Sequence, residues 1–270
     1  MPASPLMSVM ISAARKAGRS LTRDFGEVEN LQVSVKGPAN FVSAADHKAE
    51  EILFQELQKA RPGYGFLMEE RGAIAGADKT HRWIVDPLDG TTNFLHGVPM
   101  FAISIGLERD DQIVAGLIYN PIMDEMFMAE KGKGAFLADR SGRDRRLRVA
   151  ARKTLEDCLV TVGIPHRGRT NHPRFLKEAA DLMANVAGLR RTGSAALDLA
   201  WVAAGRFDAY YEYGLGAWDV AAGSVIIREA GGIVTDMAGG QDYVASGDVL
   251  AANQHVHKAL LQRLAEINGR

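Results

Sequence analysis

Apolar residues near the start of the chain recur with the period of an α-helix. The apolar face of this first predicted helix is formed by Leu6, Val9, Met10 and Ala13. A second helix is predicted to begin at Ser43, with an apolar face formed by Ala45, Ala49, Ile52, Leu53 and Leu57. The run Arg61-Pro62-Gly63 ends it, because proline and glycine disfavour continuation of a helix. The pattern therefore predicts two amphipathic helices early in the chain.

Short runs of large and β-branched residues predict strands in the rest of the N-terminal half. Residues 33–43 form an extended segment broken at Gly37-Pro38, and residues 64–70 and 81–86 form two further strands. Residues 101–149 predict an antiparallel meander, because β-rich runs alternate there with turn signals. These signals are Arg109-Asp110-Asp111, Asn120-Pro121, Lys131-Gly132 and Ser141-Gly142.

The second half of the chain alternates strands with helices. Strands are predicted at residues 158–164, 207–213, 232–236 and 248–253. Helices are predicted at residues 172–187, 194–205, 217–230 and 255–269. Such alternation is typical of an α/β unit. Since apolar density drops between Ser141 and Arg152, we expect an antiparallel α+β half over residues 1–145 and an α/β half over residues 146–270.

The composition gives no reason to expect a polyanionic or lipid partner. The chain has 270 residues, of which 47% are hydrophobic and 24% charged, with a formal net charge of −1. No stretch reaches the roughly 18 to 20 apolar residues of a membrane-spanning helix. The start of the chain lacks the basic segment of a signal peptide. The single cysteine, Cys158, fits a reducing compartment, so we expect a cytoplasmic protein without a membrane partner.

Acidic residues occur where predicted strands end or helices begin. They are Asp46, Glu69, Glu70, Asp86, Asp89 and Asp219. Oxygen ligands without histidine or cysteine partners suit a hard cation such as magnesium. Pro87 stiffens the backbone between Asp86 and Asp89, and the Leu88 carbonyl at this turn is directed to the same place.

A phosphate-binding element follows these acids directly. Gly90 permits a sharp turn, and Thr91 begins a short predicted helix whose first N–H groups suit phosphate oxygens. Acids that can bind a metal thus lie beside N–H groups that can bind a phosphate. This combination predicts metal-assisted phosphoryl transfer. Two cations roughly 3.5 to 4 Å apart stabilise both the attacking water and the leaving oxygen in such sites.

Each of these features also has a purely structural interpretation. Asp89-Gly90 is a common turn signal, and Glu69-Glu70 alone is typical of a solvated strand end. Asp46 follows Ser43 by three residues, as in a capping box, and Asp219 lies in the first turn of its helix. The combination of all four, however, would require several independent coincidences.

Two segments resemble signature motifs of a known family. Residues 83–94 read WIVDPLDGTTNF, and residues 216–232 read GAWDVAAGSVIIREAGG. Together they resemble the inositol monophosphatase family, and the run FVSAAD at residues 41–46 and the acidic pair after Met68 extend the resemblance over nearly the whole chain. The fold that this implies is a layered α/β sandwich, in which the two halves pack together with a metal site at their seam.

The resemblance implies a metal site made only of oxygen ligands. The ligands would be Glu69, Asp86, the Leu88 carbonyl, Asp89 and Asp219. The site would hold two or three magnesium ions. Two of them would share Asp86, and a third would be held mostly by water.

The resemblance also implies catalytic and substrate-binding groups. The catalytic residues would be Asp46, Thr91 and Glu69, with Asp46 and Thr91 orienting and deprotonating the attacking water. The substrate-binding residues would be Asp89, Gly90, Thr91, Gly193, Ser194, Ala195, Glu212 and Asp219. At Gly216 the side chain that some relatives carry is missing, which predicts a wider pocket.

The implied activity is magnesium-dependent hydrolysis of an inositol monophosphate by metal-activated water. Lithium inhibition and a homodimer are further expectations from the resemblance. A related sugar or polyol phosphatase, acting for example on fructose 1,6-bisphosphate, is one alternative. An RNA- or transcription-associated binding protein is another, because residues 131–153 contain nine lysines and arginines against two aspartates. A solvated hairpin edge explains that basic run better, and the complete set of acids argues against a nucleic-acid partner.

Overall fold

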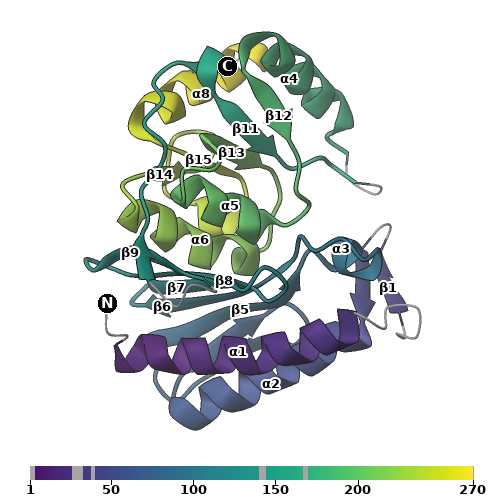
Figure 1. Cartoon of the computed structure of the whole chain (residues 1–270), viewed down its shortest axis with the longest axis vertical. Coiled ribbons are helices and arrows are strands. Elements are labelled where there is room, and N and C mark those ends of the chain that lie inside the picture. Colours follow the sequence, from purple (N-terminus) through teal and green to yellow (C-terminus); the bar gives the residue numbers. More distant parts are fainter. Residues whose placement is uncertain (1–3, 26–32, 38–39, 140–143, 167–169, 270) are drawn as a thin grey trace.

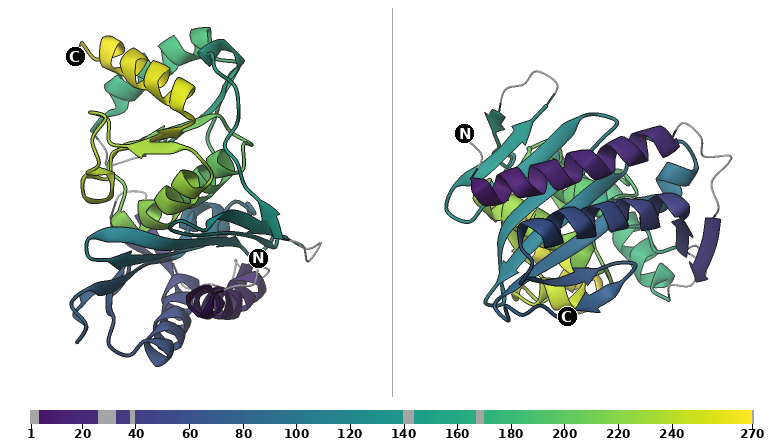
Figure 2. Two further views of the ribbon diagram at one scale, coloured as in Figure 1. Left: turned by 90° about the vertical axis from the view of Figure 1, so that its left-hand side faces the viewer. Right: turned by 90° about the horizontal axis from the view of Figure 1, so that it is seen from below.

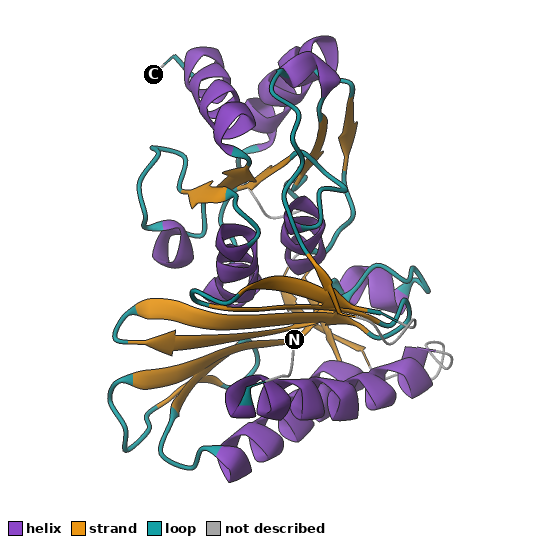
Figure 3. Ribbon diagram, turned by 60° about the vertical axis from the view of Figure 1, so that its left-hand side comes forward, coloured by secondary structure: helices purple, strands orange, loops and turns teal. Residues whose placement is uncertain are grey.

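The computed structural model describes residues 4–25, 33–37, 40–139, 144–166 and 170–269. Helical layers and sheet layers alternate along the long axis of the molecule (Figure 1, Figure 3). The layers are, in order, α1 (Pro5–Phe25) with α2 (Ala44–Ala60), an eight-stranded sheet, α5 (Ala195–Ala203) with α6 (Ala217–Glu229), a five-stranded sheet, and α4 (His172–Asn185) with α8 (Gln254–Ile267).

The larger sheet has the strand order β10-β9-β8-β7-β6-β5-β3-β4. Its strands are β3 (Gly65–Met68), β4 (Gly72–Ile74), β5 (His81–Asp89), β6 (Ala102–Arg109), β7 (Gln112–Asn120), β8 (Glu125–Glu130), β9 (Gly134–Ala138) and β10 (Asp144–Arg146). All neighbouring pairs are antiparallel except β3 and β5, which are parallel. The predicted meander is therefore confirmed.

Helices α1 and α2 cover one face of this sheet and lie side by side (Figure 2). Met10, Leu21, Leu53 and Leu57 are among the residues that these helices bury against Phe66 and other residues of the sheet. Their apolar stripes follow the helical period expected from the sequence. Burial of an aliphatic side chain contributes roughly 1.5–3 kcal/mol, so these stripes fix the two helices on the sheet.

The opposite face of the larger sheet carries α6, which packs closely against the strands. A Cβ at Gly116 of β7 would lie 2.4 Å from the carbonyl oxygen of Ala222, so no side chain fits there. Small residues on both elements allow this approach and place the start of α6 against the sheet. The position of that helix start decides where Asp219 lies.

The smaller sheet has the order β12-β11-β13-β15-β14. Its strands are β11 (Leu159–Val162), β12 (Gly188–Arg190), β13 (Ala209–Glu212), β14 (Ile233–Thr235) and β15 (Val249–Ala252). Strand β11 is parallel to β12 and β13, whereas β15 is antiparallel to β13 and β14. The remaining elements are β1 (Val33–Gly37), β2 (Asn40–Ser43), α3 (Thr91–Leu95), α7 (Tyr243–Ser246) and a 3-10 turn (Leu155–Asp157).

The predicted mixed α/β sandwich is confirmed by this arrangement. One buried cluster joins Phe127 of the larger sheet, Leu199 and Ile226 of the middle helices, and Tyr210 of the smaller sheet. Because this core is continuous across the two sheets, the division of the chain into residues 1–145 and 146–270 stays a prediction. Within the described part of the chain, every helix is too short or too polar to span a lipid bilayer.

Candidate active site

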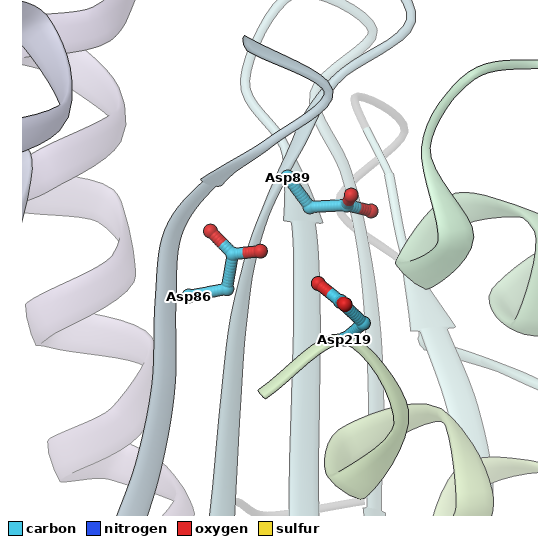
Figure 4. A group of neighbouring side chains, drawn as sticks. All are labelled: Asp86, Asp89 and Asp219. Atoms are coloured by element: carbon cyan, nitrogen blue, oxygen red, sulfur yellow. The ribbon is translucent and has the colours of Figure 1, made fainter. Parts of the chain in front are cut away.

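Two carboxylates near the end of β5 face the same space. Asp86 pairs with Ser104 of β6 and Asp89 pairs with Ala102, so three residue steps on β5 lie opposite two steps on β6. Side chains three positions apart in a regular strand point to opposite faces, and this irregular register brings them together. Figure 4 shows both carboxylates directed towards that of Asp219, which comes from α6. Carboxylate oxygens of the three residues lie within 4.8 Å of one another.

The backbone after Asp86 forms the turn that the sequence predicted. The Leu88 N–H donates a hydrogen bond of 2.8 Å to Asp86 Oδ1. Gly90 has a φ of 96°, and a Cβ there would lie 2.9 Å from the Met100 carbonyl oxygen. Glycine alone satisfies both the left-handed conformation and the close approach. Thr91 then begins α3 directly beside the acids.

Asp219 reaches the site from the first turn of α6. Its Oδ2 accepts a hydrogen bond of 2.7 Å from the Gly216 N–H. Ser104 Oγ donates to the Trp218 carbonyl oxygen at 2.9 Å and so fixes the helix start on β6. A Cβ at Gly216 would lie 2.4 Å from Trp218 Cε2. The Trp218 indole thus packs against Gly216, and the expectation that this glycine widens the pocket stays a prediction.

The two residues expected to orient the attacking water are hydrogen-bonded to each other. Thr91 Oγ1 donates to Asp46 Oδ1 at 2.9 Å and lies 3.1 Å from the Leu88 carbonyl oxygen. Asp46 is fully buried in the first turn of α2. The structure thus brings Asp46 to the turn that follows Asp86, although 40 positions separate the two residues in the sequence.

Glu69 lies beside the three carboxylates, in the turn that follows β3. Its N–H donates to the Val85 carbonyl oxygen at 3.2 Å, which continues the pairing of β3 with β5. The pKa of Asp86 is raised well above its usual range by burial and then by the negative charge of Glu69. Among the described residues, the group with oxygens within 4.8 Å contains Asp86, Asp89 and Asp219 and does not contain Glu69.

Glu50 supports this acidic turn and was not singled out from the sequence. Its buried carboxylate accepts hydrogen bonds from the Glu70 N–H at 2.9 Å and from Arg71 Nε at 3.1 Å. Glu50 lies one helical turn after Asp46 on α2, on a face that is otherwise apolar. The spacing of four residues between two acids on a buried face is the signal that would have revealed it.

Burial and the repulsion between neighbouring carboxylates raise the pKa values of the clustered acids. Burial raises the pKa of Asp89 to about 7, against the effect of its hydrogen bonds to Ser194 and Ala196. Burial and then the charge of Asp89 raise the pKa of Asp219 well above its usual range. Buried acids that repel one another are stabilised by a divalent cation between them. The donor set of oxygens alone therefore fits the hard cation expected from the sequence.

Asp89 is held in place by the start of α5. Ser194 Oγ donates to Asp89 Oδ2 at 2.6 Å, and the Ala196 N–H donates to the same oxygen at 2.7 Å. Ser194 also caps α5 by accepting from the Leu197 N–H. The segment predicted to line the sugar side thus also positions one of the acids.

A cavity of ≈ 220 Å³ opens from these acids between the two sheets. All eight predicted substrate-binding residues line it, namely Asp89, Gly90, Thr91, Gly193, Ser194, Ala195, Glu212 and Asp219. Glu212 lies over Gly163, where a Cβ would be 1.8 Å from Glu212 Cδ. The Tyr210 hydroxyl donates to Glu212 Oε2 at 2.6 Å and fixes its direction. The roles of the eight residues stay predictions, but they share one cavity.

Asp198 is a further acid of this cavity, and the sequence analysis missed it. It is 2% exposed and accepts a hydrogen bond of 2.8 Å from Thr161 Oγ1. Burial raises its pKa well above the usual range. It is a charged residue within the otherwise apolar helix α5, and that contrast is the signal that would have identified it.

The chain is similar to known proteins in both sequence and fold. The model of the inositol monophosphatase family matches residues 3–269. An inositol-1-monophosphatase of Mesorhizobium japonicum is 63% identical over 97% of each chain. A protein of Vibrio cholerae named Nus factor SuhB is 40% identical, over 97% of this chain and 96% of that protein. The crystal structure of extragenic suppressor protein suhB from Bartonella henselae has a TM-score of 0.92 and 57% identity, over 97% of this chain and 98% of that one.

Proposed function

Given that the chain belongs to the inositol monophosphatase family and is a phosphatase, we propose that it hydrolyses inositol 1-phosphate to inositol and inorganic phosphate. The observation that carries this proposal is the group of three carboxylates within 4.8 Å of one another, beside a turn and helix start that line the cavity. Acids for a cation and a helix start for a phosphate occur at the same place, as a metal-assisted phosphatase requires.

The proposed cofactor is Mg²⁺, with two or three ions per site. Its ligands would be Glu69, Asp86, the Leu88 carbonyl, Asp89 and Asp219. When bound, Mg²⁺ supplies positive charge for the phosphate oxygens and makes a neighbouring water more acidic. Magnesium is favoured over zinc because the described cluster contains carboxylates and neither histidine nor cysteine.

Asp46 and Thr91 are proposed to position the attacking water and to accept its proton. The Thr91 hydroxyl hydrogen is directed to Asp46 Oδ1, so a lone pair of Thr91 Oγ1 is left to accept a hydrogen bond from water. The proton that leaves the water passes through this hydroxyl to the Asp46 carboxylate. A positioned base of this kind contributes typically about 10²–10⁴-fold to the rate.

The phosphate is proposed to rest on the backbone at Gly90 and Thr91, which line the cavity. The inositol ring then lies towards Glu212, whose carboxylate accepts hydrogen bonds from ring hydroxyls. Because Tyr210 fixes Glu212 and Gly163 leaves room for it, this acceptor is placed before the substrate arrives. Gly193 and Ala195 complete the wall next to the ring.

Several finer expectations accompany this function. We propose that lithium inhibits the enzyme, that the protein is a homodimer and that it works in the cytoplasm. A related polyol phosphatase remains the nearest alternative, because the same acids serve any small phosphate monoester. A binding role is a second candidate, supported by the exposed Arg145, Arg146 and Arg148 at the edge of the larger sheet and by relatives named Nus factor SuhB.

The test is phosphate release from a panel of monoesters. The panel contains inositol 1-phosphate, glycerol 2-phosphate, fructose 1,6-bisphosphate, histidinol phosphate and 3′-phosphoadenosine 5′-phosphate, each assayed with magnesium, with EDTA and with lithium. Magnesium-dependent preference for inositol 1-phosphate supports the proposal. Preference for another member would keep the chemistry and change the substrate. A folded, magnesium-loaded protein without turnover of any ester would exclude the activity and favour the binding role.

A further inference from the structure

The turn that carries Glu69 lies at the edge of the larger sheet. It joins β3 to β4, and β4 is the outermost strand at this end of the sheet. The pairing of β3 with β5 ends at Met68 and Val85, and the Glu69 N–H adds one more bond to the Val85 carbonyl oxygen. The two residues that follow Glu69 lie beyond this ladder, where another element has to hold the turn.

Glu50 of α2 holds the turn from below the sheet. Its side chain is 1% exposed, and its Oε2 accepts a hydrogen bond of 2.9 Å from the Glu70 N–H and lies 3.4 Å from the Arg71 nitrogen. Its Oε1 accepts from Arg71 Nε at 3.1 Å. A carboxylate buried to this extent needs donors for both oxygens. Here both oxygens are bonded to the residues that directly follow Glu69.

The neighbouring acid on the same helix, Glu51, provides a natural contrast. Its side chain is 46% exposed, and its described hydrogen bonds come from the side chains of Arg71 and Gln55. The Arg71 guanidinium also lies 4.7 Å from the centroid of the Phe54 ring. Glu51 thus binds the end of the Arg71 side chain, whereas Glu50 binds the main chain beside Glu69.

The same helix also carries Asp46, one turn before Glu50. Asp46 is buried like Glu50, and it accepts the hydrogen bond from the Thr91 hydroxyl. Two successive turns of α2 therefore reach two parts of the proposed site. One contact fixes the residues proposed to position water, and the other fixes the turn of Glu69.

We propose that Glu50 is a positioning residue for magnesium, which holds the turn after β3 so that the Glu69 carboxylate can join the other ligands. The inference rests on the proposed cation site and deepens it, because a residue outside the ligand set then determines how tightly magnesium binds. Replacing a group that orients a metal ligand typically costs about 10–100-fold in metal affinity or activity. Glu50 should act on cation binding rather than on the chemical step.

The experiment compares Glu50→Gln with the matched control Glu51→Gln in the full chain. Glutamine has nearly the shape of glutamate but replaces one acceptor oxygen by an NH₂ group, so one donor of the turn loses its acceptor. Magnesium binding to the metal-free protein is measured by titration calorimetry. Hydrogen exchange of residues 65–74, which span β3, the turn and β4, reports on the turn itself. Activity on inositol 1-phosphate is measured over a range of magnesium concentrations.

Glu50→Gln is expected to raise the Kd for magnesium about tenfold, together with the magnesium concentration that gives half-maximal activity. Exchange in residues 65–74 should become faster. At saturating magnesium, kcat should stay within about threefold of the wild type and KM should not change. Glu51→Gln should leave the Kd within about twofold, because it removes only an exposed contact.

Glu50→Asp is a second variant that keeps the negative charge beside Arg71. Its side chain is shorter by one methylene, which withdraws the carboxylate from the Glu70 N–H. The Kd for magnesium should therefore rise by about threefold or more, as the loss of one hydrogen bond predicts. Circular dichroism identifies which of the two variants is folded, and a folded variant of either kind tests the inference.

The outcomes separate this inference from the phosphatase function. An unchanged Kd or unchanged hydrogen exchange in a folded Glu50 variant, or an equal rise of Kd in Glu51→Gln, overturns the role of Glu50. A fall in kcat at saturating magnesium with an unchanged Kd overturns it as well. Weaker magnesium binding in Glu50→Gln without turnover of any ester by the wild type supports the inference and overturns the phosphatase function. A wild type that binds no magnesium overturns the cation site and the inference together.

Discussion

The two sides of the cavity are built in different ways. On the side of the larger sheet, Asp86, Asp89 and the phosphate-binding turn come from one run of the chain, residues 86–91. The acids that join them from other elements are Asp46, Glu69 and Asp219. On the opposite side, the wall is assembled from residues 162–166, 171–175, 191–195 and 212–215. The first side is specified by local sequence, whereas the second requires the smaller sheet and α4 to be in place. Substitutions on the first side should therefore lower kcat, whereas substitutions on the second side should mainly change KM and the choice of substrate.

Asp86→Asn should give the largest effect. Asp86 is proposed to be shared between two cations, so its loss should lower kcat at least about a thousandfold in magnesium, while circular dichroism shows an intact fold. The matched control is Glu108→Gln, which removes an acid of β6 that pairs with Arg82 away from the site. Turnover within a few-fold of the wild type would contradict the proposed cation site.

Thr91→Val should have the next largest effect on the same side. It removes the hydroxyl that donates to Asp46, so kcat should fall about a hundredfold while KM changes little. Thr91→Ser keeps the hydroxyl and should retain most of the activity. Steady-state kinetics on inositol 1-phosphate provide the measurement. Equal activity of the valine and serine variants would show that the hydroxyl does not handle the attacking water.

The first side of the cavity was largely predictable from the sequence. Asp86, Asp89 and Thr91 lie within one motif, so their proximity followed from short-range geometry. The limits of the elements were less accurate, since the helix predicted at Ser43 begins at Ala44 and the strand predicted to end at Asp86 continues to Asp89. That last error arose because the irregular pairing with β6 carries the strand past Pro87.

The second side was predictable only through resemblance, because its contacts join distant residues. Asp89 and Ser194 are 105 positions apart, and Thr161 and Asp198 are 37 positions apart. Periodicity reports which face of an element is buried but not which element covers it. The supporting acid Asp198 was missed for this reason, although it is a charged residue on a buried helix face.

Glu178→Gln is expected to affect substrate selection rather than chemistry. Glu178 is fully buried on α4, and its Oε1 accepts hydrogen bonds from Arg174, Tyr213 and Asn268 at 2.9, 2.9 and 2.7 Å. Since Tyr213 lines the cavity, loss of the charge should loosen that wall and raise KM about five-fold, with kcat within about twofold. The free energy of unfolding should fall by about 1–3 kcal/mol.

The control for Glu178→Gln is Asp181→Asn on the same helix. Asp181 pairs with Arg263 of α8 and does not line the cavity. It should lose some stability without a change in KM. If both variants raise KM equally, or if Glu178→Gln lowers kcat alone, α4 contributes only general stability to the substrate wall.

The smallest expected effect is a pH dependence of thermal stability. It tests whether bound cations offset the cost of ionising the buried acids on the first side. Asp89 has a folded-state pKa of about 7 against an ordinary value of 3.8, because burial disfavours its charge. A raised carboxyl pKa stabilises the fold below pH ~4, and this stabilisation is lost as the pH rises through about 7. In EDTA, Tm should therefore fall by on the order of 5 °C between about pH 5 and about pH 8. Magnesium should offset the fall, because it favours the ionised acids, and Asp89→Asn should weaken the pH dependence. A Tm in EDTA that rises over this range would show that the charges of the clustered acids do not oppose folding.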